Sequence, residues 1–318
     1  MTIKKLLQTA RGKIALPEAE LLLAHALSLP RERIIAHPEK KVGFWRRKKF
    51  QKNVKNRQNG RPVAYLVGHK EFFGLDFLVN RHTLIPRPET ELIVEEIIKD
   101  VRDMRDEIKD KLLLIDVGTG SGCIPISIMK TLAPNPMWFG VKTFGVDISR
   151  RALRVAKKNS KKHKVNIKFI QGNLLQPILT SKPQHQSKAR YGAQHLNPKT
   201  LKHIFITANL PYLTEEQFKS EKSIQFEPKS ALVAKDDGLY LYKKLLRQIK
   251  LLVTRYLLLV TCFFEIDPAQ TDKIKTLIKQ YLPAARVEIN PHTNPPAGGG
   301  VRVKKDLCGQ DRLVIFDI

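Results

Sequence analysis

A continuous apolar run, LLLIDV at 112–117, leads directly into the glycine-rich turn GTGSG at 118–122. An apolar run without alternation is typical of a parallel strand that is buried on both faces of its sheet. A glycine-rich turn after such a strand meets the start of a helix and lets a ligand approach the backbone closely. We therefore expect the first strand of an α/β sheet here, with a ligand site at its end.

Strand-like and helix-like segments alternate from this run to the C-terminus. This alternation is typical of an α/β fold with a mostly parallel sheet. The last two expected strands have no helix between them, so we expect a hairpin that makes one of them antiparallel. The expected strands are 112–117, 142–148, 165–171, 203–209, 255–266, 285–290 and 311–318, and the expected helices start at about 123 and span 149–162, 237–252 and 267–282.

The first 60 residues have a different, helical pattern. Apolar residues recur at helical spacing in PEAELLLAHALSL at 17–29. The segment 40–57 carries nine Lys or Arg residues and no acidic residue, with Phe44, Trp45 and Phe50 interleaved. It is either a solvated helix whose aromatic residues pack inward or a basic docking face.

The remaining segments define the expected domains. Glycines punctuate alternating apolar residues over 61–82, as in a β-hairpin, and a helix-like stretch follows at 85–98. Residues 176–203 are polar and basic and interrupt the alternation, so we expect a surface insertion there. The expected organisation is an N-terminal helical domain at 1–60, a hairpin connector at 61–84 and an α/β domain at 85–318.

Composition narrows the partners and the compartment. The net charge of +27 favours acidic partners such as RNA, a ribonucleoprotein surface or an acidic protein, unless the source simply uses much lysine. The three cysteines lie far apart without Cys/His ligand spacing, so we expect neither disulfides nor a metal site. The N-terminus lacks the apolar stretch of a signal peptide, and the run at 251–264 is too short for a membrane span. We expect a cytoplasmic protein without membrane contact.

Polar residues follow four of the expected strands. The turn 118–122 follows the first strand, Asp147 ends the second, and Asn173 and Asn209 follow the next two. Ligands of open α/β sheets bind beyond the carboxyl ends of the strands, so these groups are expected to converge. An acidic residue at the second position accepts hydrogen bonds from ribose hydroxyls. Asn173 is either an acceptor for an adenine amino group or a turn residue.

The fourth strand ends in Asn209-Leu210-Pro211-Tyr212. The side-chain oxygen of Asn209 and the carbonyl of Leu210 can hold the two hydrogens of a planar NH2 group, and Tyr212 can pack against its plane. An amide or aromatic amine nitrogen is a poor nucleophile, and such acceptors direct its lone pair toward an electrophile. The tetrapeptide therefore suits a site beside a methyl donor.

In this order, DVGTGSG, VDIS, GNLL and NLPY resemble a class I S-adenosylmethionine-dependent methyltransferase, with a Rossmann-like, mostly parallel sheet and an antiparallel last strand. The segments 72–95, 226–246 and 303–315 resemble the HemK/PrmC family more closely. Members of that family methylate the side-chain amide nitrogen (N5) of the glutamine in the GGQ motif of peptide chain release factors. The resemblance runs from about residue 17 to the C-terminus, except for the insertion.

The resemblance implies a cofactor, S-adenosylmethionine, and roles for the residues at the strand ends. The turn wraps the methionine part of the cofactor, Asp147 binds its ribose, and Asn173 and Leu174 lie against its adenine. Asn209, which also borders the cofactor, and the Leu210 carbonyl hold the glutamine amide in a slot shaped by Pro211 and Tyr212. The implied turn residues are Gly118, Thr119, Gly120, Ser121 and Gly122. No metal is implied.

Two positions depart from the family pattern, and two other functions stay open. Leu210 stands where the family has proline, and Asn173 stands where aspartate is usual. NLPY also resembles the motif of ribosomal-RNA adenine dimethyltransferases, so one alternative is an RNA or DNA adenine N6-methyltransferase. The charge and the segment 40–57 support that alternative, whereas 72–95 and 303–315 oppose it. The other alternative is a non-catalytic protein that binds RNA or the ribosome.

Overall fold

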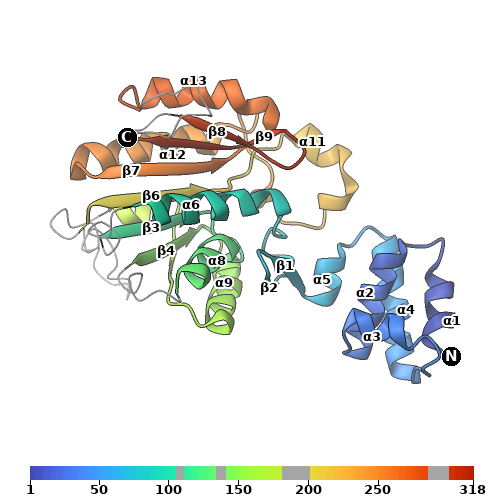
Figure 1. The fold of residues 1–318 in the computed structure, drawn as a ribbon. Coiled ribbons are helices and arrows are strands. Elements are labelled where there is room, and N and C mark those ends of the chain that lie inside the picture. Colours follow the sequence, from blue (N-terminus) through green and yellow to red (C-terminus); the bar gives the residue numbers. More distant parts are fainter. Residues whose placement is uncertain (105–110, 134–140, 181–200, 286–300) are drawn as a thin grey trace, which may run out of the picture.

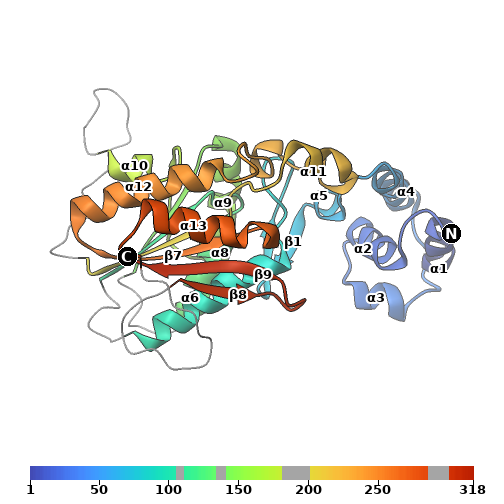
Figure 2. The same ribbon diagram turned by 90° about the horizontal axis from the view of Figure 1, so that it is seen from above.

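The computed structural model describes residues 1–104, 111–133, 141–180, 201–285 and 301–318. It contains a seven-stranded sheet covered by helices on both faces, and a helical unit at one end of that sheet (Figures 1 and 2). A two-stranded hairpin lies between them. The expected α/β architecture with a small N-terminal helical part is therefore confirmed.

The sheet is parallel except at one edge. β3 pairs in parallel with β4 on one side and with β6 on the other, and β6 pairs in parallel with β7. β9 pairs antiparallel with β7 and β8, which confirms the expected antiparallel last strand. Across the sheet, the strands run β5 (Lys168–Gln171), β4 (Lys142–Asp147), β3 (Leu112–Val117), β6 (His203–Ala208), β7 (Leu259–Glu265), β9 (Asp311–Asp317) and β8 (Arg302–Lys305).

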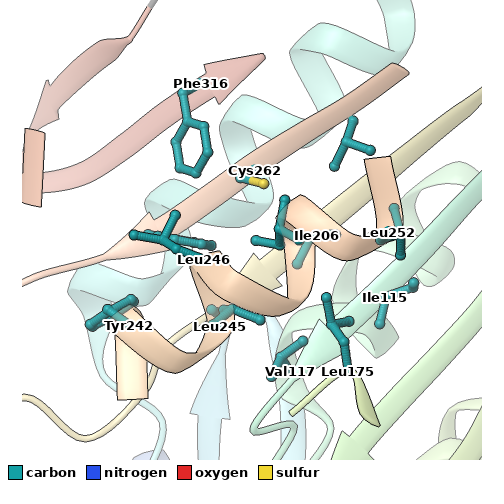
Figure 3. Close-up of a cluster of buried hydrophobic side chains, with 14 of the residues drawn as sticks. Ile115, Val117, Leu175, Ile206, Tyr242, Leu245, Leu246, Leu252, Cys262 and Phe316 are labelled. Carbon is teal, nitrogen blue, oxygen red and sulfur yellow. The ribbon is translucent and has the colours of Figure 1, made fainter. Parts of the chain in front are cut away.

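Alternating side chains of the central strands build two hydrophobic cores. Ile115 and Val117 of β3 join one core with α12 (Tyr240–Tyr256) and α13 (Thr271–Tyr281), and Figure 3 shows them facing α12. Leu112 and Leu114 point to the opposite core with α6 (Glu91–Asp103) and α8 (Cys123–Leu132). Complete burial of one such side chain contributes about 1.5–3 kcal/mol. Strand β3 is therefore fixed from both faces.

The remaining helices confirm the sequence pattern with small shifts. Ser149 caps α9 (Arg150–His163) by accepting from the backbone N–H of Ala152, 3.2 Å away. The expected strand 255–266 begins later, because α12 continues to Tyr256. The expected insertion 176–203 begins with a short helix, α10 (Gln176–Leu179), and β6 already starts at His203. Residues 181–200, and the expected strand 285–290 apart from Ala285, lie outside the described residues.

The helical unit has its own apolar core. Four of its helices confirm the expected helical pattern, and a fifth, α5, was not predicted and packs against the same core through Val63, Leu66 and Val67. Phe50 is buried in this core, whereas Phe44 and Trp45 are exposed, so inward packing is wrong for two of the three aromatic residues. The helices are α1 (Ile3–Ala10), α2 (Leu16–Leu27), α3 (Arg31–Ala36), α4 (Phe44–Gln58) and α5 (Val63–Val67). The expected division at residues 60 and 84 stays a prediction.

The hairpin is confirmed, although it is shorter than 61–82. β1 (His69–Phe72) pairs antiparallel with β2 (Leu75–Leu78). The side chain of Asn159 on α9 fastens it, because its Oδ1 accepts from the N–H of Leu78 at 2.8 Å and its Nδ2 donates to the Leu78 carbonyl at 3.0 Å. The chain then forms a 3-10 turn, η1 (Pro88–Thr90), before α6 begins at Glu91.

The segment between β6 and α12 folds back over the end of β6. The N–H of Leu213 donates to the Leu232 carbonyl at 2.9 Å, and the N–H of Ala234 donates to the Leu213 carbonyl at 3.0 Å. A short helix, α11 (Glu215–Ser220), lies in this segment. Farther along, Gly238 lies directly against Tyr212. The tetrapeptide 209–212 is thus enclosed by the segment that follows it.

Alanine substitutions at two glycines can test how tightly the chain packs around Tyr212. Gly238 has φ +82°, and a Cβ added there would lie 1.9 Å from the Tyr212 carbonyl oxygen. Gly309 has a similar φ of +76°, but a Cβ added there would have no atom of a non-neighbouring residue within 4 Å. Alanine therefore brings similar backbone strain at both positions but a collision only at Gly238. We expect Gly238→Ala to lower the free energy of unfolding by about 1–3 kcal/mol more than Gly309→Ala, measured by urea denaturation. Equal losses in the two variants would contradict this.

Candidate active site

The glycine turn is held against the neighbouring strand. The N–H groups of Gly118 and Thr119 both donate to the Val146 carbonyl, at 2.8 and 3.0 Å. Thr119 and Ser121 are buried, and Gly122 precedes α8. A Cβ at Gly118 would lie 3.1 Å from Leu210 Cδ2 and 3.7 Å from the Asn209 carbonyl oxygen. The turn therefore directly adjoins the tetrapeptide, as the convergence of strand ends predicts.

Asp147 orders the same turn from the end of β4. Its Oδ2 accepts from the N–H of Gly120 at 2.9 Å, and its Oδ1 accepts from the N–H of Ser149 at 2.7 Å. Burial raises the pKa of Asp147, while these two donors lower it. Each carboxylate oxygen can accept more than one hydrogen bond, so both can still accept from ribose hydroxyls.

Asp116, one residue before the end of β3, is a buried carboxyl that the sequence analysis gave no role. It is 1% exposed, and its Oδ1 accepts from the Thr207 hydroxyl at 2.6 Å. Its Oδ2 has no partner that meets hydrogen-bond geometry among the described residues, although the Thr119 side chain lies near enough to lower its pKa. Burial raises the pKa of Asp116 to about 6. The sequence signal for this residue is an acidic side chain inside the apolar run 112–117. A buried polar atom without a partner in a native structure requires an explanation, and binding of a ligand is one.

Asn209 is oriented by Thr90, which precedes α6. The Asn209 Nδ2 donates to the Thr90 hydroxyl at 3.0 Å, and Thr90 is 3% exposed. The amino group of Asn209 is therefore turned inward, and its Oδ1 remains as an acceptor for a ligand. No hydrogen bond to the Leu210 carbonyl is present within the described ranges. Both acceptors that the sequence predicts are thus available.

The rest of the tetrapeptide is fixed from α12 and from the turn before α13. The Leu210 N–H donates to the Tyr242 hydroxyl at 3.4 Å, and Pro211 is buried. The Tyr212 carbonyl accepts from Nε2 of Gln270 at 3.1 Å. The Tyr212 hydroxyl donates to Oε1 of Glu265 at 3.5 Å, and burial raises the pKa of Tyr212, so this hydroxyl stays protonated. These contacts hold the slot in one shape.

Asn173 and Leu174 lie beside Asp147, where the sequence predicts the adenine side of the site. The N–H of Gly172 donates to the Asp147 carbonyl at 3.0 Å, which brings the end of β5 to the end of β4. Leu174 is buried, and Asn173 is partly exposed. The carbonyl of Asn173 accepts from the N–H of Gln176 at 3.2 Å, as in a turn. Both assigned roles remain predictions.

Comparison with known proteins places this site in a family. A model of the PrmC N-terminal domain matches residues 2–68, and a methyltransferase-domain model matches 108–189. The release factor glutamine methyltransferase of Bacillus subtilis is 34% identical over 298 residues, which cover 93% of this chain and 89% of that protein. The chain belongs to the release factor glutamine methyltransferase family.

A second relative and one solved structure are also similar to this chain. The release factor glutamine methyltransferase of Bacillus anthracis is 30% identical over 94% of this chain and 91% of its own length. Among solved structures, the N-terminal domain of human METTL16 in complex with SAH has a TM-score of 0.45 and 17% identity, and the match covers 83% of each chain.

The strand ends fit the cofactor of a class I methyltransferase, S-adenosylmethionine. The free oxygen of Asp116 suits a cationic group, and Asp147 suits ribose hydroxyls. At Gly120, a Cβ would have only the Gly118 carbonyl within 4 Å, at 3.8 Å, so the middle of the turn is open to a ligand. Among the residues that the structure describes, no three His, Cys, Asp or Glu side chains gather as metal ligands would.

Three further residues that contact the segments of the candidate site were not identified in the sequence analysis. Thr90 and Glu265 both lie at the tetrapeptide. Glu227 is 5% exposed, forms an ion pair with Arg87, and accepts through Oε2 from the N–H of Ile85 at 2.9 Å. It thereby ties the segment that precedes α6 to the segment that encloses the tetrapeptide. These residues belong to segments that are far apart in the sequence, so only the three-dimensional structure shows that they lie together.

Asp147 provides a test of the cofactor site. We expect Asp147→Ala to weaken S-adenosylmethionine binding about tenfold or more in isothermal titration calorimetry, because it removes the ribose acceptors and frees the N–H of Gly120. Asp267→Ala is the matched control: its Oδ1 also accepts a backbone N–H, from Ala269 at 2.9 Å, but next to α13. Unchanged affinity in Asp147→Ala would show that Asp147 does not bind the cofactor.

Proposed function

We propose that this protein transfers a methyl group from S-adenosylmethionine to the side-chain amide nitrogen (N5) of the glutamine in the GGQ motif of peptide chain release factors. The contact of Gly118 with Asn209 and Leu210 carries this proposal, because it sets two free acceptors beside the cofactor turn. The similarity to release factor glutamine methyltransferases over more than nine-tenths of the chain supports the substrate.

The geometry suggests how the amide is activated. Oδ1 of Asn209 and the Leu210 carbonyl accept the two amide hydrogens, which fixes the orientation of the nitrogen. Pro211, which is buried, and Tyr212, which is partly buried, shape the slot. When bound, S-adenosylmethionine supplies the methyl group, in line from its sulfonium sulfur to that nitrogen. Orientation provides most of the acceleration, and the proton that the nitrogen loses passes to water.

We assign substrate docking to residues 1–60, connection to 61–84 and methyl transfer to 85–318. The match of the PrmC N-terminal domain model to residues 2–68 and the separate helical core support a distinct docking part, and both extend past residue 60 to α5. Phe226 packs against the end of the helical unit, since a Cβ at Gly60 would lie 3.1 Å from its Cε2. Within the described residues, no helix is long and apolar enough to cross a membrane. We place the enzyme in the cytoplasm, where release factors act.

Three substrates distinguish the proposed function from its alternatives. The protein is incubated with labelled S-adenosylmethionine and with an intact release factor, its GGQ Gln→Ala variant, or ribosomal RNA. We expect label only in the intact release factor. Label in RNA would favour an adenine methyltransferase, and label that survives the Gln→Ala change would contradict the assigned position. Absence of both label and cofactor binding would favour a non-catalytic binding protein.

Asn209→Ala tests the role of the slot. We expect turnover to fall about tenfold or more, because one of the two acceptors for the amide hydrogens is lost. The affinity for S-adenosylmethionine, measured by calorimetry, should change little. Turnover within about threefold of wild type, a difference under roughly 1 kcal/mol, would show that Asn209 does not hold the amide.

We also propose that α4 contacts RNA. Trp45 is 77% exposed and Phe44 is 50% exposed, and the Lys48 Nζ lies 4.6 Å from the centre of the Phe44 ring. Of the basic residues on α4, Arg57 forms an ion pair, with Glu18 at 2.9 Å, and the others have no acidic partner in the part of the chain that the structure describes. Exposed aromatic rings among unpaired cations suit stacked bases and phosphates.

Charge reversal on α4 tests this surface. We expect Lys48→Glu with Lys49→Glu to weaken binding of a labelled ribosomal-RNA fragment in fluorescence anisotropy. A plot of the logarithm of the binding constant against the logarithm of the salt concentration has a negative slope. The magnitude of this slope should decrease by about 0.9 for each lost phosphate contact. The control pair is Lys157→Glu with Lys158→Glu on α9, which is equally exposed and carries the same charge. If the two double variants weakened RNA binding equally, the net charge of the protein and not α4 would account for the binding.

A further inference from the structure

Glu265 is a buried carboxyl at the tetrapeptide for which methyl transfer has so far required no role. It ends β7 and is 2% exposed. Its Oε1 accepts from the Tyr212 hydroxyl at 3.5 Å, and its Oε2 has no partner that meets hydrogen-bond geometry among the described residues. Its backbone carbonyl accepts from the Tyr242 hydroxyl. Both its side chain and its main chain therefore contact groups that hold the slot.

The register of the sheet places this carboxyl next to Asn209. Thr207 pairs with Phe263 and Ala208 pairs with Phe264, so the next positions are Asn209 and Glu265. Phe205 and Phe263 point to the core under α6 and α8, and residues at a spacing of two share a face. Asn209 and Glu265 therefore project to the same face, where Thr90 precedes α6.

An ionised carboxylate determines which atoms of the neighbouring side chains point toward it. It can only accept hydrogen bonds, so the groups that face it must donate. The side chains of Thr90 and Asn209 lie near the carboxyl as donor groups and lower the pKa of Glu265. The Asn209 Nδ2 also donates to the Thr90 hydroxyl at 3.0 Å. The arrangement thus turns the nitrogen of Asn209, and not its oxygen, toward the interior.

We propose that Glu265 is a positioning residue for methyl transfer: its carboxylate keeps the amino group of Asn209 inward, so that Oδ1 faces the substrate amide as an acceptor. A protonated Glu265 can donate, and the Asn209 amide can then rotate so that its oxygen faces inward. In that orientation Asn209 presents its NH2 to the NH2 of the substrate, and the slot loses one of its two acceptors. The proposal rests on the proposed function of the slot.

The surroundings of Glu265 make this protonation accessible near neutral pH. Burial raises the pKa of Glu265 to about 7, and nearby Glu89 acts in the same direction. Arg312 lowers the pKa but donates to Asp306 at 2.9 Å, and no ion pair joins it to Glu265 within the described ranges. The titratable or charged groups that face Glu265 are Glu89 before α6, Cys123 on α8, Tyr212 after β6, Tyr242 on α12 and Arg312 on β9.

Glu265→Gln tests the proposal by kinetics, because glutamine keeps the shape but can donate as well as accept. We expect its kcat for a release factor to fall about tenfold or more above pH 7, with KM and cofactor affinity within about threefold of wild type. The kcat of the wild type should rise with pH through about 7, whereas that of Glu265→Gln should not.

Glu96→Gln is the matched control. Glu96 is also a buried glutamate whose Oε2 has no partner in the described part of the chain, but it lies on α6 and pairs with Lys304 at 3.1 Å. We expect this variant to keep the kcat and the pH profile of the wild type. An active wild type with an equally active Glu265→Gln would overturn the role of Glu265, whereas a wild type without transfer would instead overturn the proposed function.

Stability measurements separate positioning from a purely structural role. The folded protein holds a proton on Glu265 up to about pH 7, whereas the unfolded chain releases it near 4.3. The contribution of Glu265 to stability therefore falls as pH rises between these values. Glu265→Gln removes that loss, so we expect its stability relative to wild type to increase with pH. If the loss of kcat in Glu265→Gln were fully explained by a smaller folded fraction, Glu265 would have a purely structural role and the proposed positioning role would be contradicted.

The orientation of Asn209 can also be followed without catalysis. In protein labelled with 15N on asparagine, the side-chain NH2 signal of Asn209 is identified by its absence in Asn209→Asp. We expect this signal to shift with pH through about 7 in wild type and Glu96→Gln, and to stay constant in Glu265→Gln. A signal that does not respond to pH in the wild type would overturn the proposal whatever the enzyme methylates.

Discussion

The register between β3 and β6 brings the glycine turn next to the tetrapeptide. Val117 pairs with Ala208, so the residues that follow, Gly118 and Asn209, leave the sheet side by side. A shift of one residue in this pairing would move Asn209 to the other face of the sheet. The apolar side chains of β3 and β6 enter both cores, and the hydrophobic burial of these two strands is therefore what keeps the cofactor turn and the substrate slot in contact.

Buried polar side chains gather on the face under α6 and α8, at the carboxyl ends of its strands. Asp116, Thr207, Asn209 and Glu265 lie near the carboxyl ends of three adjacent strands, and Thr90, just before α6, contacts Asn209. Buried polar groups are stable only when they are paired, so each member restricts its neighbours. Within this set, Oδ2 of Asp116 and Oε2 of Glu265 are the carboxyl oxygens that have no partner among the described residues.

The sequence predicted the parts of this structure that short-range pattern controls. Continuous apolar strands such as β3, the cap at Ser149 and the order of strands and helices all follow from local chemistry. The edge strand β8, with the sequence RVKK, and the five-residue helix α5 were missed because neither has a strong period. Thr90 and Glu265 were missed for another reason: one was expected within a helix and the other within a buried strand, and only tertiary structure joins them to Asn209.

The Tyr242 hydroxyl has a consequence for how this slot could evolve. A proline at position 210, as in the resembling family, has no N–H, whereas Leu210 places a donor in a buried position. The Tyr242 hydroxyl accepts from that donor while it donates to the Glu265 carbonyl. Loss of the Tyr242 hydroxyl would therefore leave the Leu210 N–H without this acceptor, whereas a proline at position 210 would not need one. Tolerance of leucine in the slot is thus set by a side chain on α12, 32 positions along the chain.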